Sequence, residues 1–205
     1  EEDFDIAKSL GHSAHRFYIE WSRIEPEEGK FDEREIEHYR QVILALKERG
    51  LEPFITLWHW TQPVWIKNMG GWANSKTIDY YEQYVERISS LFSNDVRLWN
   101  PLNEPNIYTS FGYVVGTHPP GIKNIILAWK VFQNLINAHK KAYRAIKGYN
   151  SKACVGSVSS VMYFDTRIFI LADKLINNFL NYFWNKWFFN KTRGYNDFIG
   201  CNYYT

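Results

Sequence analysis

The sequence has 205 residues, of which 45% are hydrophobic and 22% charged, and its formal net charge is +2. This composition is typical of a globular chain with one sizeable core, and it lacks the basic excess of a nucleic-acid-binding protein. Aromatic residues reach 18%, including nine Trp, and we expect most of the Trp side chains to fill the core.

Several common classes of protein are disfavoured by single features. Cys154 and Cys201 stand far apart and outside any metal or redox spacing, so we expect both to be small core residues and infer no metal or cofactor. No apolar run reaches the length of a membrane span and no signal peptide opens the chain, so we expect no membrane partner and a cytoplasmic location. Residues 1–5 resemble a helix already in progress and 202–205 a strand, so both ends are expected to be cut.

Strand-like and helix-like segments alternate along the chain. Period-two alternation or short apolar runs predict strands at 14–21, 53–58, 96–102, 153–159 and 198–204. Apolar residues at three-and-four spacing predict helices at 33–49, 77–92, 122–147 and 168–189. Asp32 with Glu35 resembles a capping box, and Gly50 and Gly148 are suitable residues for helix ends.

The last predicted helix, 168–189, has two interpretations. Its almost unbroken apolar stripe suits packing against a sheet, and it also suits a helix that lies on a membrane surface. The polar side is mostly Asn with few Lys or Arg, which is not the polar face of a membrane-surface helix. We therefore expect packing against the sheet.

Alternating strands and helices predict a parallel sheet, either a doubly wound open sheet or a (β/α)8 barrel. Nucleotide-binding open sheets usually have a Gly-rich phosphate loop after an early strand, and no such loop is present in this sequence. Polar residues instead fall at the carboxyl ends of successive strands, namely Glu20, His59, Asn103, Glu104, Asn202 and Tyr204. This favours the barrel, here incomplete with about five of eight βα units, and we expect residues 1–205 to form one partial domain.

Glu104 is the central candidate for chemistry. It lies at a predicted strand end between Asn103 and Pro105, and Pro105 disfavours helical backbone angles at the residue before it. A carboxyl at the mouth of a barrel can act as a general acid. A surface Glu before a turn would give the same local pattern, so this interpretation stays open at this point.

A series of stretches in this order resembles glycoside hydrolase family 1, the β-glucosidase and β-galactosidase family. The matching stretches are 15–26 (HRFYIEWSRIEP), 53–60 (PFITLWHW) with Pro63 and Trp65, 70–72 (GGW), Trp99 through 103–105 (NEP), 119–121 (PPG), 138–139 (AH) and 197–205 (DFIGCNYYT). One Asn-Glu-Pro is a weak signal, whereas the ordered series is specific. The resemblance implies strands two to six of a (β/α)8 barrel.

The same resemblance implies a retaining β-glycosidase that acts on small β-glycosides or oligosaccharides. Glu104 is similar to the family's acid/base. Substrate-binding roles fall on four residues, His59, Trp60, Asn103 and Asn202, with Asn103 on the sugar 2-hydroxyl. Arg16 and Tyr204 are similar to the residues that orient the nucleophile. The structural alternative for Arg16 is an ion pair with Glu20.

The sequence also departs from the family pattern. Thr61-Gln62 replaces a usual Asp-Leu or Thr-Leu pair, and Pro101 stands where Thr is common. The family nucleophile is a Glu on strand seven, which we expect to lie outside this chain, because Asp165, Asp173 and Asp197 do not follow strands. We therefore expect the segment alone to be inactive. The alternatives are a truncated barrel that binds carbohydrate without chemistry and another type of barrel glycosidase.

Overall fold

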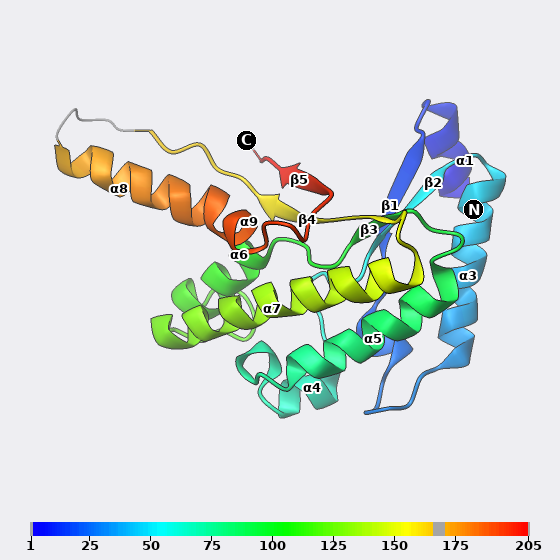
Figure 1. The fold of residues 1–205 in the computed structure, drawn as a ribbon, viewed down its shortest axis with the longest axis horizontal. Coiled ribbons are helices and arrows are strands. Elements are labelled where there is room, and N and C mark those ends of the chain that lie inside the picture. The colour runs from blue at the N-terminus through cyan, green and yellow to red at the C-terminus, as the bar shows by residue number, and fades with distance from the viewer. Residues whose placement is uncertain (1, 166–170, 205) are drawn as a thin grey trace.

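The computed structural model describes residues 2–165 and 171–204, and its strands and helices alternate along the chain (Figure 1). The strands are β1 (Ala14–Tyr18), β2 (Glu52–Thr56), β3 (Leu98–Asn100), β4 (Cys154–Ser160) and β5 (Phe198–Asn202). The longer helices are α1 (Glu2–Ser9), α3 (Glu33–Glu48), α5 (Thr77–Phe92), α7 (Ile125–Tyr149) and α8 (Leu171–Asn181). The short helical segments are α2 (Trp21–Ile24), α4 (Val64–Asn68), η1 (Gly71–Ala73), α6 (Pro105–Thr109), η2 (Ser110–Val115), η3 (Tyr182–Lys186) and α9 (Trp187–Lys191).

The order of the strands decides between the two predicted architectures. The sheet runs β1-β2-β3-β4-β5, and every neighbouring pair is parallel. Each strand therefore adds on the same side of the one before it, whereas a doubly wound sheet reverses its order at a switch point. The barrel prediction is confirmed in its incomplete form, because the sheet formed by the described residues holds five strands and a closed (β/α)8 barrel needs eight.

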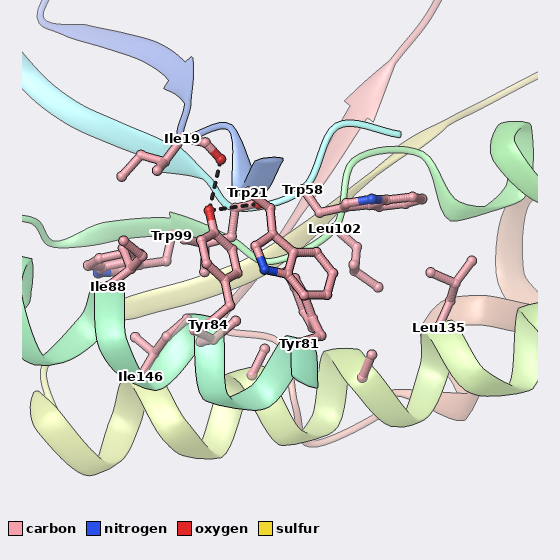
Figure 2. Close-up of a cluster of buried hydrophobic side chains, with 14 of the residues drawn as sticks. Ile19, Trp21, Trp58, Tyr81, Tyr84, Ile88, Trp99, Leu102, Leu135 and Ile146 are labelled. Atoms are coloured by element: carbon pink, nitrogen blue, oxygen red, sulfur yellow. Dashed lines mark hydrogen bonds between the residues drawn. The ribbon is translucent and has the colours of Figure 1, made fainter. Parts of the chain in front are cut away.

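The core lies between the sheet and the helices α5 and α7, which pack side by side (Figure 1). Five of the Trp side chains are buried, which confirms their predicted structural role: Trp21, Trp58, Trp72, Trp99 and Trp187. Figure 2 shows Tyr84 of α5 reaching up to the strand ends, where its hydroxyl donates to Ile19 O at 2.8 Å and to Leu57 O at 3.2 Å. Tyr84 therefore ties the helix layer to the rim of the sheet.

The ends of α3 follow local chemistry. The Asp32 carboxylate accepts from the backbone N–H groups of Arg34 and Glu35, as an N-cap residue does. Gly50 takes a φ of +65°, which suits the glycine expected beyond the helix end. The reciprocal half of the predicted capping box is wrong, because the Glu35 side chain pairs with Arg23 at 2.6 Å instead.

Several predicted boundaries are corrected by side chains that intervene. Strand 14–21 stops at Tyr18, because Glu20 caps the short helix α2 and turns the chain. Strand 96–102 shrinks to β3, and Pro101, which has no N–H to give to the ladder, follows it directly. Helix 122–147 runs instead from Ile125 to Tyr149. Gly148 therefore lies inside the helix and does not end it.

The predicted helix 168–189 is the largest correction. Its residues 168–170 lie outside the described part of the chain, and the rest divides into α8, η3 and α9. Trp187 and Phe188 join the core. In contrast, α8 projects from the body in Figure 1, and Leu175, Ile176 and Phe179 are 58–64% exposed. The expected packing is therefore seen at Trp187 and Phe188, and it is wrong for the described side chains of α8.

Two smaller observations complete the fold. Both Cys are free, with Cys154 partly buried and Cys201 exposed, so the prediction that both are core residues is wrong. They lie on β4 and β5, and side chains that alternate along the open edge strand β5 face outward as well as inward. Among the described residues, no helix combines the length and apolar character that crossing a bilayer requires.

Candidate active site

The predicted site residues gather at one edge of the sheet, where the carboxyl ends of parallel strands meet. Glu104 follows β3, and its Oε1 accepts from Asn202 Nδ2 at 2.8 Å and from the Tyr204 hydroxyl at 3.3 Å. Asn202 ends β5 and Tyr204 follows it. Because β4 lies between β3 and β5, these contacts span the full width of a strand.

The backbone holds Glu104 in an uncommon conformation. Its φ and ψ are 47° and 58°, in the left-handed region, and Pro105 disfavours the right-handed helical alternative at the preceding residue. The Glu104 N–H donates to Val158 O of β4 at 2.7 Å, and the residue is 3% exposed. The carboxyl is therefore buried in the mouth of the sheet, and the alternative of a surface Glu before a turn is wrong.

Arg16 of β1 lies beside Asn103. Its Nη2 donates to Asn103 Oδ1 at 2.5 Å and its Nε donates to Thr56 Oγ1 at 2.8 Å. Partial burial lowers the pKa of Arg16, while the charge of Glu104 acts in the opposite direction. The alternative pairing with Glu20 is wrong, because the Glu20 carboxylate instead accepts from Ser22 of α2 and from Thr61, which lies in the loop between β2 and α4.

The Asn103 amide is oriented by its neighbour. Since a guanidinium can only donate, the oxygen of the amide must face Arg16, and Nδ2 points the other way. Among the described residues, Nδ2 is buried and has no hydrogen-bond partner. Buried amide donors are almost always paired in folded proteins. This donor is therefore available to a group that enters the mouth from outside.

His59 and Trp60 follow β2 at the same mouth. His59 is exposed at the mouth, yet desolvation by its neighbours, and then the charge of Arg16, lower its pKa, while Glu104 and Glu20 act in the opposite direction. His59 is therefore a neutral imidazole near pH 7 that can donate to, or accept from, a hydroxyl. Trp60 has a φ of +75°, and its indole Nε1 donates to Asn103 O at 3.1 Å. Trp60 thus joins the ends of β2 and β3.

A cavity of about 400 Å³ opens next to these residues. Part of its wall was singled out from the sequence: His59, Trp60, Thr61, Gln62, Pro119 and Pro120. The rest was not: Val64, Lys67, Ile107, Tyr108 and His118. These residues come from α4, from α6 and from the loop after η2, all of which are too short to show a helical period. The cavity wall is mostly apolar, as in sites for small organic molecules.

Asp197, the last acidic residue of the chain, does not lie at the mouth. Asp197 stands at the start of β5, where it pairs with Lys147 at 2.7 Å and accepts from the Val155 N–H at 2.8 Å. That position is the amino end of the strands, opposite Glu104. Within the described ranges, no cluster of three or more His, Cys, Asp or Glu side chains has the arrangement of a metal site.

The sequence matches known proteins over most of its length. The family model described as glycosyl hydrolase family 1 matches residues 1–195. Beta-glucosidase A of Thermotoga maritima is 34% identical over 166 residues, which are 80% of this chain and 37% of that protein. The cytosolic beta-glucosidase of Homo sapiens is 31% identical over 162 residues, which are 78% of this chain and 34% of that protein.

Solved structures give the same answer for the fold. The family 1 β-glucosidase of Thermotoga maritima superposes on the whole chain with a TM-score of 0.91 at 29% identity, and the chain covers 52% of it. The beta-glycosidase of Pyrococcus horikoshii gives 0.92 at 33% identity, with 51% of that protein covered. The chain thus spans about half of these structures and just over a third of the curated relatives. It belongs to glycosyl hydrolase family 1, and it forms five of the eight βα units of a (β/α)8 barrel.

Proposed function

We propose that the family 1 barrel containing this chain hydrolyses β-glycosides with retention of configuration, and that Glu104 is its acid/base. The observation that carries the proposal is a buried carboxyl at the carboxyl end of β3, beside a mostly apolar cavity and an unpaired amide donor. In the first step Glu104 protonates the departing glycosidic oxygen, and in the second it removes a proton from water.

The contacts of Glu104 distinguish its two oxygens. Asn202 and Tyr204 both donate to Oε1. A carboxyl oxygen that accepts two hydrogen bonds is a poor place for a proton, so Oε2 is the atom that carries the proton to the leaving group. Asn202 and Tyr204 then have a positioning role toward Glu104, in addition to the contacts that the family resemblance implies with sugar and nucleophile.

Three groups are suited to contact the sugar itself. The unpaired Asn103 Nδ2 is a donor for the 2-hydroxyl, a contact that strengthens in the oxocarbenium-like transition state. The neutral His59 imidazole is suited to a second hydroxyl. Trp60 provides an indole whose N–H is already bonded to Asn103 O, so its ring face is held in place for packing against the sugar.

A retaining mechanism needs a second carboxylate about 5 Å from the acid/base. Arg16 supports a position for it, because the guanidinium is partly buried and, in the described part of the chain, forms no ion pair with a carboxylate. We place the nucleophile against Arg16 and outside residues 1–205. This segment alone then does not hydrolyse an aryl β-glucoside. A measurable rate that Glu104→Gln abolishes would show that the second carboxylate lies inside the chain.

A second candidate is carbohydrate binding without catalysis. The observation in its favour is that the cavity and the sugar-facing donors lie within this chain, whereas in its described part we assign one of the two carboxylates that a retaining mechanism needs. This candidate would be supported if a completed barrel that contains residues 1–205 binds a sugar mimic but does not hydrolyse any glycoside. The two functions are therefore separated by the behaviour of a completed barrel.

A chimera tests the proposal. Residues 1–205 replace the matching half of the Thermotoga maritima β-glucosidase, on which the whole chain superposes. We expect hydrolysis, and we expect Glu104→Gln to lower kcat/KM by about 10²–10⁴-fold for an alkyl β-glucoside, whose leaving group needs a proton. The loss should be much smaller for a dinitrophenyl glucoside. Glu25→Gln is the matched control, because Glu25 is buried but bonds to Trp21 and Gly29 away from the mouth. Equal losses in both variants contradict the assignment.

A further inference from the structure

A second buried carboxylate, Glu20, has no part in the mechanism above. It lies two residues after β1 and is 9% exposed. Its oxygens accept from Ser22 Oγ at 2.8 Å and from Thr61 Oγ1 at 2.8 and 2.9 Å. In the described ranges no Lys or Arg forms an ion pair with it. Because burying a carboxylate without a cation is costly, the hydrogen bonds it makes must hold it in place.

One of those bonds reaches the strained turn at the mouth. Trp60 has a φ of +75°, a conformation that persists in a bulky residue only when its surroundings enforce it. On one side, the Trp60 indole N–H donates to Asn103 O at 3.1 Å. On the other side, the next residue, Thr61, is anchored on both oxygens of Glu20. The turn is thus held from β3 and from β1.

A second connection runs through Tyr18. Its pKa is raised to about 12, chiefly because its hydroxyl hydrogen-bonds to the Glu20 carboxylate. The Tyr18 ring meets the His59 imidazole edge to face, with centroids 5.8 Å apart and planes at 71°. His59 also lies edge to face with Trp60 at 5.5 Å. The imidazole is therefore bounded by one ring that Glu20 anchors and by one ring of the strained turn.

We infer that Glu20 is a positioning residue, which fixes His59 and Trp60 in one orientation at the mouth through Thr61 and Tyr18. The role of this arrangement in sugar binding rests on the proposed function of His59 and Trp60. The contacts of Glu20 themselves do not depend on that proposal. Glu20 also caps α2, but the capping bond from the Ser22 N–H is 3.4 Å long. The shorter bonds go to hydroxyl groups, so capping alone does not account for the contacts of Glu20.

Thr61 offers the cleanest substitution. Thr61→Val removes the hydroxyl, keeps the shape of the side chain, and leaves Glu20 its contacts with Ser22 and Tyr18. Thr61→Ser restores the hydroxyl and serves as the rescue. Thr77→Val is the matched control, because the Thr77 hydroxyl is buried and donates to Gly71 O at 2.6 Å, and no hydrogen bond joins it to Glu20. It reports on any general loss of stability.

Two NMR measurements on the 205-residue chain read out the turn. The first is hydrogen exchange of the Trp60 indole N–H. The bond from the Thr61 hydroxyl to the Glu20 carboxylate is strong because its acceptor is charged. Thr61→Val removes this bond and loosens the turn, so we expect the exchange of the indole N–H to become about tenfold faster or more. The second is the pKa of His59, which faces Arg16, Glu104 and Glu20. Loosening the turn hydrates the imidazole, and its pKa then rises toward the ordinary value.

The expected pattern is specific to the inference. Thr61→Val changes both signals, Thr61→Ser returns both to the wild-type values, and Thr77→Val leaves both unchanged. The inference is overturned if Thr61→Val matches the wild type, or if Thr77→Val changes the two signals as much. Neither signal involves a glycoside, so the outcome is independent of whether the proposed hydrolysis is found.

Discussion

His139 makes the stability of the chain depend on pH. It lies on α7 and is fully buried, with its Nε2 2.7 Å from Tyr195 O and its ring against Phe188. Burial lowers its pKa to about 4, against the opposing effect of the bonds to Tyr195 and Asn196. The folded chain therefore keeps a neutral imidazole at pH values where an exposed histidine is charged.

The sign and size of the effect follow from proton linkage. Between pH 6.5 and about 4, the unfolded chain binds a proton at this position and the folded chain does not. The free energy of unfolding therefore falls as the pH falls through this window, by up to about 1.4 kcal/mol per pH unit. The full difference between pH 7.5 and pH 4 is about 3 kcal/mol from this one residue.

Urea unfolding of His139→Gln tests this value. A glutamine amide can still donate to Tyr195 O, and it does not titrate. We expect the variant to lose about 2 kcal/mol less than the wild type when the pH falls from 7.5 to 5. The exposed His38 provides the control His38→Gln, which should keep the wild-type dependence. An unchanged pH dependence in His139→Gln would refute the reasoning.

Three further predictions concern stability measured by urea unfolding. Tyr84→Phe should cost about 1–2 kcal/mol, because Ile19 O loses a buried donor, while the exposed control Tyr149→Phe should change little; equal effects would contradict the role of the Tyr84 hydroxyl. Phe188→Ala should cost about 3–5 kcal/mol, and Phe179→Ala, 64% exposed on α8, less than about 1 kcal/mol; a large loss at Phe179 would mean that α8 is covered in solution. Asp32→Ala should cost about 1 kcal/mol through the lost N-cap, and Asp32→Asn should restore most of it; no loss in the Ala variant would refute the capping role.

The parts of the fold that were predictable are those set by a long period. α3 and α5 each present one apolar face over 16 residues, and their predicted limits differ from the observed ones by at most a single residue. α4 and α6 have five residues each, too few for a helical period, and were missed. For α8 the stripe predicted the helix but not its surroundings, because a period identifies an apolar face and not what covers it.

The site was predictable in its membership and not in its contacts. Parallel strands bring their carboxyl ends together, so the gathering of His59, Glu104 and Asn202 follows from topology. Which atoms bond depends on register and side-chain length across several strands. Arg16 illustrates this dependence, because the nearby Glu20 was a plausible partner in sequence, whereas the guanidinium bonds to Thr56 and Asn103.

The strained residues indicate why the remaining contacts could not be derived locally. Trp60 and Glu104 are the described non-glycine residues with positive φ, and both stand at the mouth. Each costs on the order of 1–3 kcal/mol, which its own sequence neighbourhood does not repay. Asn103 connects them, since its backbone oxygen accepts from the Trp60 indole and its amide holds Arg16. A single residue thus couples β1 to the ends of β2 and β3, while the Glu104 N–H bond to Val158 O adds β4. The conformation of Glu104 is therefore a property of the assembled sheet, so a peptide spanning residues 99–110 alone should not adopt it.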